Sequence, residues 1–143
     1  MKLKKLHLDL ILIDLLRNHK YPATNTADKN DNYSKILSVY DYIDKHLNDD
    51  LTLDNLAKIA NLSPNYLSHI FKQLNGVGLW DYIIAKRVEK AARMLCDSNS
   101  NRSILGVAIE CGFNNTANFN KAFKKLKNIT PSQLRKNPKL LSH

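Results

Sequence analysis

One stretch of the sequence places short polar side chains and a cation at three- and four-residue spacing. It holds Asn65, Ser68 and His69, with Lys72 and Gln73 behind them. Asn pairs bidentately with adenine, Ser bonds to either kind of base and His donates to guanine acceptors, so the first three side chains could read base edges. Lysine and glutamine side chains bond to phosphate oxygens. The combination predicts a helix that lies in the major groove of DNA.

A second stretch repeats this composition with more lysine. Its expected outward residues are Thr116, Ala117, Asn120 and Lys121, followed by Lys124 and Lys125. We predict base contacts for the first four residues and phosphate contacts for the last two. Lys121 suits a guanine edge or a phosphate, whereas Ala117 offers only a methyl group, against a thymine methyl. Base reading by the second stretch is therefore expected to be weaker.

An ordinary solvated helix face is the alternative for each of these residues taken singly. Net charge favours a polyanionic partner: the 143 residues carry 22 Lys and Arg against 13 Asp and Glu, a net charge of +9. The first 50 residues hold eight groups of each sign, so the whole excess lies in residues 51–143. A neutral segment followed by a basic one is typical of nucleic-acid binding.

Capping residues place the first stretch on the second helix of a pair. Thr52 is a good N-cap for one helix, which ends at a turn over Asn61-Leu62, since Asn tolerates left-handed backbone. Ser63 caps the next helix, Pro64 occupies its first position and Gly76 ends it. The inward stripe of this second helix is Leu67, Ile70, Phe71 and Leu74.

The same pattern then returns. Ser103 caps a short helix, Gly112-Phe113 makes the turn, and Asn115 caps a helix that runs to about Lys127. Equivalent pairs are Thr52 with Ser103, Leu56 with Val107, Ala57 with Ala108, Leu62 with Phe113, and Phe71 with Phe123. A short helix, a tight turn and a second helix form the helix-turn-helix unit, so the chain is predicted to contain two.

The predicted fold is all-α, because Gly and Pro are scarce, with four of each. Residues 32–137 are expected to form lobe one (32–78), a connecting helix (79–95) and lobe two (96–137). The first helix of lobe one has an apolar face through Ile36, Tyr40, Ile43 and Leu47, after capping candidates Asp31, Asn32 and Ser34. A connecting helix of about 24 Å could hold two recognition helices about 34 Å apart, one DNA turn.

Residues 1–20 predict an amphipathic helix that is apolar over much of its surface, and residues 21–31 a linker. Lys2, Lys4 and Lys5 before this apolar stretch resemble a signal peptide. Asp9 and Asp14 interrupt the stretch, however, and no small-residue cleavage site follows. The expected location is the cytoplasm, with no membrane association.

Catalytic sites are not indicated. Cys96 and Cys111 form no CxxC pair and have no His at metal-ligand spacing, so both are interpreted as buried thiols in a reducing compartment, with no metal or cofactor. A DNA alkyltransferase, the nearest enzyme class, needs clustered cysteines. An architectural DNA-binding protein needs apolar wedges or basic arms, and a protein-interaction module would not need the charge of +9. We predict a protein without enzymatic activity.

The motifs LTLDNLAKIANLSPNYLSHIFKQLNG, WDYIIAKRVEKAARML, ILGVAIECGFNNTANFNKAFKK and ITPSQLR follow one another along the chain. Together they resemble the DNA-binding domain of the AraC/XylS-type bacterial transcription regulators, from about Ile36 to Arg135. The resemblance implies a seven-helix, two-lobed domain that binds promoter DNA and usually activates transcription, with RNA polymerase as a partner. It implies base contacts at the same residues as the helical faces do.

The resemblance also concerns three single positions and the N-terminus. Arg87 matches a family arginine for which we expect a structural or phosphate-contacting role. Asn128 stands where the family usually has Gly, and Ala117 where it often has a polar residue. Larger members carry a sensing and dimerising domain first, and Met1–Lys20 looks like its last helix. We therefore expect a C-terminal piece of a longer regulator, and the alternative is a one-domain regulator with an extra helix. A homodimer could form through this helix or through a missing sensor domain.

Overall fold

The computed structural model describes residues 26–142, and within this range the chain is helical with no strand, as predicted. Its elements are α2 (Thr26–Lys45), α3 (Leu53–Ala60), α4 (Pro64–Asn75), α5 (Leu79–Cys96), α6 (Ile104–Glu110), α7 (Thr116–Lys127), α8 (Pro131–Lys136) and the 3₁₀ helix η1 (Pro138–Ser142). The helix predicted over Met1–Lys20 lies outside the described residues, as does most of the predicted linker.

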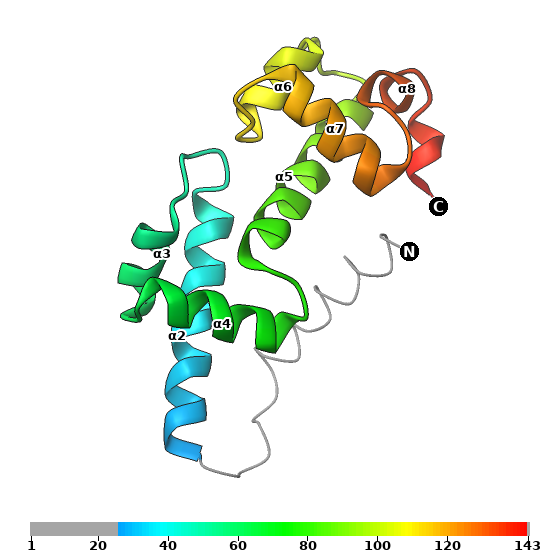
Figure 1. Ribbon diagram of the computed structural model, residues 1–143. Helices are drawn as coiled ribbons and strands as arrows, with labels where there is room; N and C mark the ends of the chain where they lie inside the picture. The colour runs from blue at the N-terminus through cyan, green and yellow to red at the C-terminus, as the bar shows by residue number, and fades with distance from the viewer. Residues whose placement is uncertain (1–25, 143) are drawn as a thin grey trace. The chain divides into compact units, whose positions relative to one another are not determined.

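The described chain divides into two compact units. Unit one consists of residues 26–46 and 51–81, and unit two of residues 47–50 and 82–142. Unit one therefore contains α2, α3 and α4, and unit two contains α6, α7, α8 and most of α5. Each unit carries one of the two predicted helix-turn-helix pairs, α3 with α4 and α6 with α7 (Figure 1).

The core of unit one forms where α3 packs on α2 and on α4. The predicted face of α2 is buried, with Ile36, Tyr40 and Ile43 each at most 1% exposed. Phe71 of α4 meets the Tyr40 ring edge to face, with ring centroids 5.5 Å apart. Edge-to-face packing is a preferred aromatic geometry, and it fixes α4 against α2.

The core of unit two is richer in aromatic residues. Phe119 lies between Phe113 and Phe123, with ring centroids 5.2 Å and 5.6 Å apart. Val88, Ala91, Ala92, Leu95, Val107, Ala108, Cys111 and Leu134 complete the cluster. Leu141 of η1 packs against it, so unit two continues past residue 137, where the predicted domain ended.

Two predictions about local structure need correction. α2 begins at Thr26, so the predicted linker 21–31 ends six residues earlier than expected. The expected caps Asp31, Asn32 and Ser34 lie inside this helix, where an ion pair between Asp31 and Lys35 (3.0 Å) bridges one turn. Cys96, the last residue of α5, is only partly buried, and its sulfur lies 4.0 Å from the carbonyl oxygen of Pro138. No helix in the range 26–142 is long and apolar enough to span a membrane.

Candidate nucleic-acid interface

The first candidate surface is the outward face of α4. The Ser63 hydroxyl accepts a hydrogen bond from the backbone N–H of Tyr66 (3.2 Å), and Pro64 stands in the first turn, so the helix begins where predicted. Its outward residues, all exposed, are Asn65, Ser68, His69, Lys72 and Gln73. They line one shallow hollow on the surface. The structure therefore brings together all five residues predicted on this helix, and α4 contains no acidic residue.

The second candidate surface is the outward face of α7. Asn115 caps the helix by accepting a hydrogen bond from the backbone N–H of Asn118 at 2.8 Å. Five of the six predicted residues are exposed: Ala117, Asn120, Lys121, Lys124 and Lys125. Thr116, at the first position of the helix, is half-buried. α7 also contains no acidic residue, and its lysines make this face the more basic of the two.

The turn inside each pair sets the angle of the outward helix. In unit one the turn is made by Asn61, with a left-handed φ of 54°. In unit two it is made by Gly112, with a φ of 98°. A Cβ at Gly112 would lie 2.6 Å from Arg87 Nε and 2.8 Å from the carbonyl oxygen of Leu47. Only glycine fits there, both for its backbone conformation and for the space available.

Arg87 has a structural role, one of the two roles expected for it. Its Nε donates to the carbonyl oxygen of Leu47 and a terminal nitrogen donates to that of Asp49, both at 2.9 Å. Burial lowers the pKa of its guanidinium, although nearby Asp50 opposes this shift. Two of its nitrogens are thus engaged with backbone carbonyls of residues 47–50. These two bonds do not test the phosphate contact expected for Arg87, which stays a prediction.

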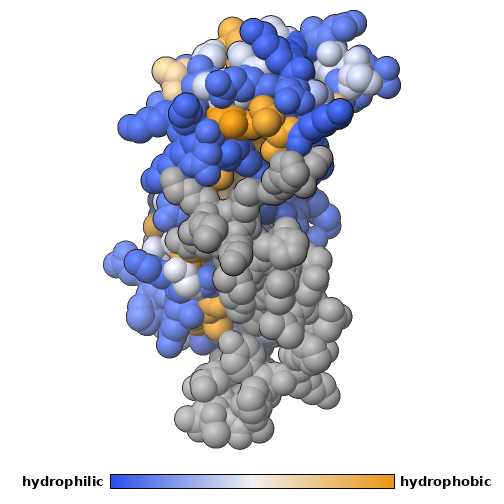
Figure 2. Space-filling model, turned by 90° about the vertical axis from the view of Figure 1, so that its right-hand side faces the viewer, coloured by the Kyte–Doolittle hydropathy of each residue, from blue (hydrophilic) through white to orange (hydrophobic). Residues whose placement is uncertain are grey.

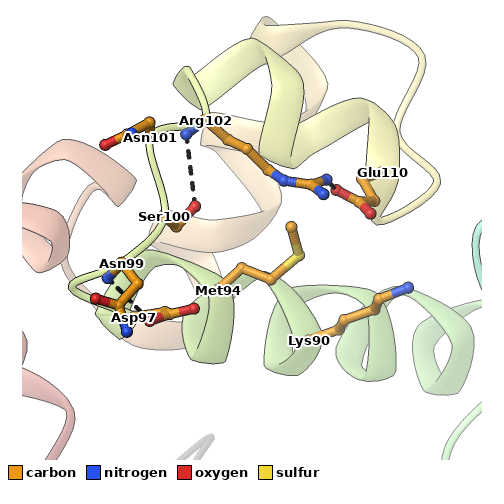
Figure 3. Close-up of a pocket in the computed structure, with 8 residues that line it drawn as sticks. All are labelled: Lys90, Met94, Asp97, Asn99, Ser100, Asn101, Arg102 and Glu110. Atoms are coloured by element: carbon orange, nitrogen blue, oxygen red, sulfur yellow. Dashed lines mark hydrogen bonds and ion pairs between the residues drawn. The ribbon is translucent and has the colours of Figure 1, made fainter.

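A second hollow lies in unit two, between α5, the loop after it and α6 (Figure 3). Lys90 and Met94 line it from α5, while Arg102 and Glu110 form an ion pair on its other side. Asp97 also lines the hollow and accepts a hydrogen bond from the backbone N–H of Asn99 (3.0 Å). Its two acids oppose phosphate binding, which distinguishes this hollow from the faces of α4 and α7.

Comparison with known proteins identifies the family. A family described as a helix-turn-helix domain matches residues 56–137, more than half of the chain. The C-terminal domain of AraT, a response regulator from Geobacillus stearothermophilus, superposes with a TM-score of 0.66 at 34% identity, over 71% of this chain and 84% of that one. The chain belongs to the AraC-type helix-turn-helix family.

Two further relatives extend this AraC-type assignment. The DNA-binding domain of AdpA, solved in complex with a target DNA, has a TM-score of 0.63 at 27% identity, covering 68% of this chain and 86% of that one. Regulatory protein PocR from Salmonella typhimurium is 36% identical over 110 residues, or 77% of this chain and 36% of PocR. The AraC-type chain spans between 18% and 36% of the curated relatives it matches first.

The family's glycine is replaced by Asn128 in this AraC-type chain, and the turn is preserved. Asn128 adopts a left-handed φ of 65°, and its backbone N–H bonds to the carbonyl oxygen of Lys124. Asn tolerates this conformation better than other residues with a side chain. The expectation that the turn survives is confirmed.

Sequence reasoning missed the contacts that hold the last residue of each outward helix. In unit one, Asn75 ends α4 and is only 4% exposed. Its amide nitrogen donates to the carbonyl oxygen of Phe71 (2.8 Å), and its oxygen accepts a hydrogen bond from the Tyr40 hydroxyl. In unit two, Lys127 ends α7 with a side chain only 4% exposed, and its ammonium lies 2.7 Å from Glu89. Both residues looked like ordinary polar ends of surface helices.

The two thiols lack the features of reactive cysteines. Cys111 is fully buried in unit two, and its sulfur lies 3.6 Å from that of Met94. Burial raises the pKa of both the Cys111 and the Cys96 thiol. A raised pKa keeps a thiol protonated, whereas a nucleophilic cysteine needs a lowered one.

Proposed function

We propose that this chain is a sequence-specific DNA-binding transcription regulator that reads two successive major grooves with α4 and α7. The observation that carries the proposal is the outward face of α4, where five polar or cationic side chains surround one hollow without an acid. Support also comes from the repetition of this composition on α7. AdpA, a relative by fold, was solved with its target DNA.

The chemistry of each side chain indicates whether it contacts a base or a phosphate. Asn65, Ser68 and His69 supply most of the base discrimination, each good contact contributing about 1–3 kcal/mol. Lys72 and Gln73 bond to phosphates and carry no sequence information. On α7, Thr116, Ala117, Asn120 and Lys121 discriminate less strongly, since a methyl group and a half-buried hydroxyl offer little to a base edge. Lys124 and Lys125 contribute a salt-dependent attraction to phosphates.

Transcription activation, RNA polymerase as a partner and a homodimer are further parts of the proposal. The family assignment and the relatives named as regulators support a role in regulation. A reporter gene placed behind the selected DNA site tests the sign of regulation. Higher expression with the chain present supports activation, and lower expression would assign repression instead.

Selection of bound duplexes from a random library tests the proposed function itself. We expect a motif with two half-sites about one helical turn apart, bound far more tightly than scrambled DNA at two salt concentrations. A single half-site would mean that only α4 reads bases. Enrichment of no sequence, with affinity that falls steeply as salt rises, would contradict sequence-specific binding.

Two variants of α4 separate base reading from phosphate binding. His69→Ala should relax the preference at one or two base pairs and weaken binding to the selected duplex by about 1–3 kcal/mol. Lys72→Ala is the matched control on the same face, and it should weaken selected and scrambled duplexes alike, with a smaller salt dependence. Equal losses on both duplexes for His69→Ala would show that His69 does not read a base. Fluorescence anisotropy titrations measure the dissociation constant for each duplex.

A further inference from the structure

We infer that Tyr66 is an additional DNA contact of unit one, and that its hydroxyl donates a hydrogen bond to a backbone phosphate beside the base-reading face of α4. The inference rests on the proposed function, because it names one more contact of the same surface. Tyr66 is a large aromatic residue in the first turn of α4, and 44% of it is exposed.

The position of Tyr66 around α4 points to a phosphate rather than a base. Tyr66 and Gln73 are seven residues apart, close to two full helical turns, so both lie along one flank of α4. Ile70, on the other side of Tyr66 in projection, is 6% exposed and marks the boundary with the core. Two of the three residues expected to read bases, Asn65 and His69, lie nearer the middle of the exposed arc, and Ser68 lies at its opposite edge. A helix in the major groove presents its middle to the bases and its flanks to the phosphate walls.

The hydroxyl of Tyr66 accepts a hydrogen bond within unit one and can still donate its own proton to a phosphate. The amide nitrogen of Asn32, on α2, donates to the Tyr66 hydroxyl oxygen at 3.0 Å. A phenol oxygen that accepts one hydrogen bond can still donate its O–H to another acceptor. Phosphate oxygens are acceptors only, and tyrosine is among the residues that bond to them.

Asn32 positions the ring from a different helix. Because the hydroxyl is held from α2, the ring loses less freedom when DNA binds, and less of the contact's free energy goes into ordering it. This support exists because α2 begins at Thr26 and continues through Asn32 as helix. Unit two has Asn118 at the equivalent position of α7, and an asparagine side chain has a shorter reach. The contact therefore belongs to unit one alone.

Tyr66→Phe in the full chain tests the contact, since it removes the hydroxyl and keeps the ring. We expect about tenfold weaker binding to the selected duplex and to its scrambled counterpart alike. The sequence preference and the salt dependence should not change, because a neutral donor releases no counterion. Tyr42→Phe is the matched control: it removes a phenol hydroxyl from α2 in the same unit, where the ring stacks on His46, and it should bind like the unchanged chain.

Phosphate ethylation interference locates the contact on DNA. For the unchanged chain, ethylation of the phosphates beside the α4 half-site should weaken binding. For Tyr66→Phe, one of these phosphates should lose its effect while the others keep theirs. Asn32→Ala should weaken binding less than Tyr66→Phe does, and it should reduce the effect of ethylation at the same phosphate.

The outcomes separate this inference from the proposed function. If the unchanged chain enriches no duplex, the proposed function and this contact are both wrong. If it enriches a motif but Tyr66→Phe binds like Tyr42→Phe with an unchanged interference pattern, only the contact is wrong. A shifted preference at one base pair in Tyr66→Phe would show that Tyr66 reads a base, which also overturns the inference.

Discussion

Units one and two repeat the same pair of helices, yet they hold the outward helix by different chemistry. The last residue of α4 is Asn75 and the last residue of α7 is Lys127, and these two positions are equivalent in the repeat. Asn75 joins Tyr40 through a buried hydrogen bond between neutral groups, whereas Lys127 pairs with Glu89 through opposite charges. Equivalent positions thus both anchor the end of a helix, but they do so through different interactions.

The turns differ in the same way. Asn61 in unit one adopts a left-handed conformation that asparagine accepts, and Gly112 in unit two is surrounded by Arg87 and the carbonyl oxygen of Leu47. The turn of unit one therefore accommodates a side chain, whereas the turn of unit two requires a residue without one. The surface follows the same contrast, since α7 carries more lysine than α4 while α4 carries the greater variety of hydrogen-bonding groups. On the face that Figure 2 shows, most described residues are polar, and hydrophobic residues form separate patches.

The largest expected effect concerns the turn of unit two. Gly112→Ala should lower the free energy of unfolding of unit two by roughly 2–4 kcal/mol, since the backbone conformation and the crowding both oppose a Cβ. Hydrogen exchange measured by mass spectrometry on peptides of α6 and α7 reports this loss. Gly78→Ala, measured on peptides of unit one, is the control, because a Cβ there would lie 3.6 Å from its nearest neighbour. A loss below about 0.5 kcal/mol, which is usual for surface substitutions, would show that the turn of unit two accepts a side chain as readily as that of unit one.

The ion pair at the end of α7 gives the next effect. Glu89→Gln leaves the nearly buried Lys127 ammonium without its counter-charge and should cost about 1–3 kcal/mol. Lys127→Met removes the charge and keeps an apolar stem, so it should cost less than about 1 kcal/mol. Urea denaturation followed by circular dichroism measures both variants. Equal losses for the two would mean that the attraction between the charges, not the stranded ammonium, decides the result.

The neutral anchor of unit one gives the smallest effect of the three. Tyr40→Phe leaves the buried Asn75 oxygen without this donor and should cost about 1–2 kcal/mol. Trp80, the only tryptophan of the chain, lies in unit one and reports its unfolding by fluorescence. Tyr42→Phe, at a partly exposed position, should stay within roughly 0.5 kcal/mol of the unchanged chain. If Tyr40→Phe cost more than Glu89→Gln, the contrast between the two anchors would be reversed.

Much of the fold could be predicted because its signals are local. Helix caps act over three residues, so Thr52, Ser63, Ser103 and Asn115 mark helix starts in the sequence and in the structure. The periodicity of apolar residues likewise identified the buried faces of α4 and α7. With the buried face known, the exposed face follows, and for this reason the predicted residues of α4 lie together on its outward side.

The sequence by itself determined the class of the fold, the two helix-turn-helix pairs and which face of each outward helix meets solvent. Only the tertiary structure decided the role of Arg87, the crowding at Gly112, the anchors Tyr40 with Asn75 and Glu89 with Lys127, and the support of Tyr66 by Asn32. Each of these contacts joins residues at least 25 positions apart. A hydrogen bond depends on distance and angle in space, and neither is written in the spacing of residues along the chain.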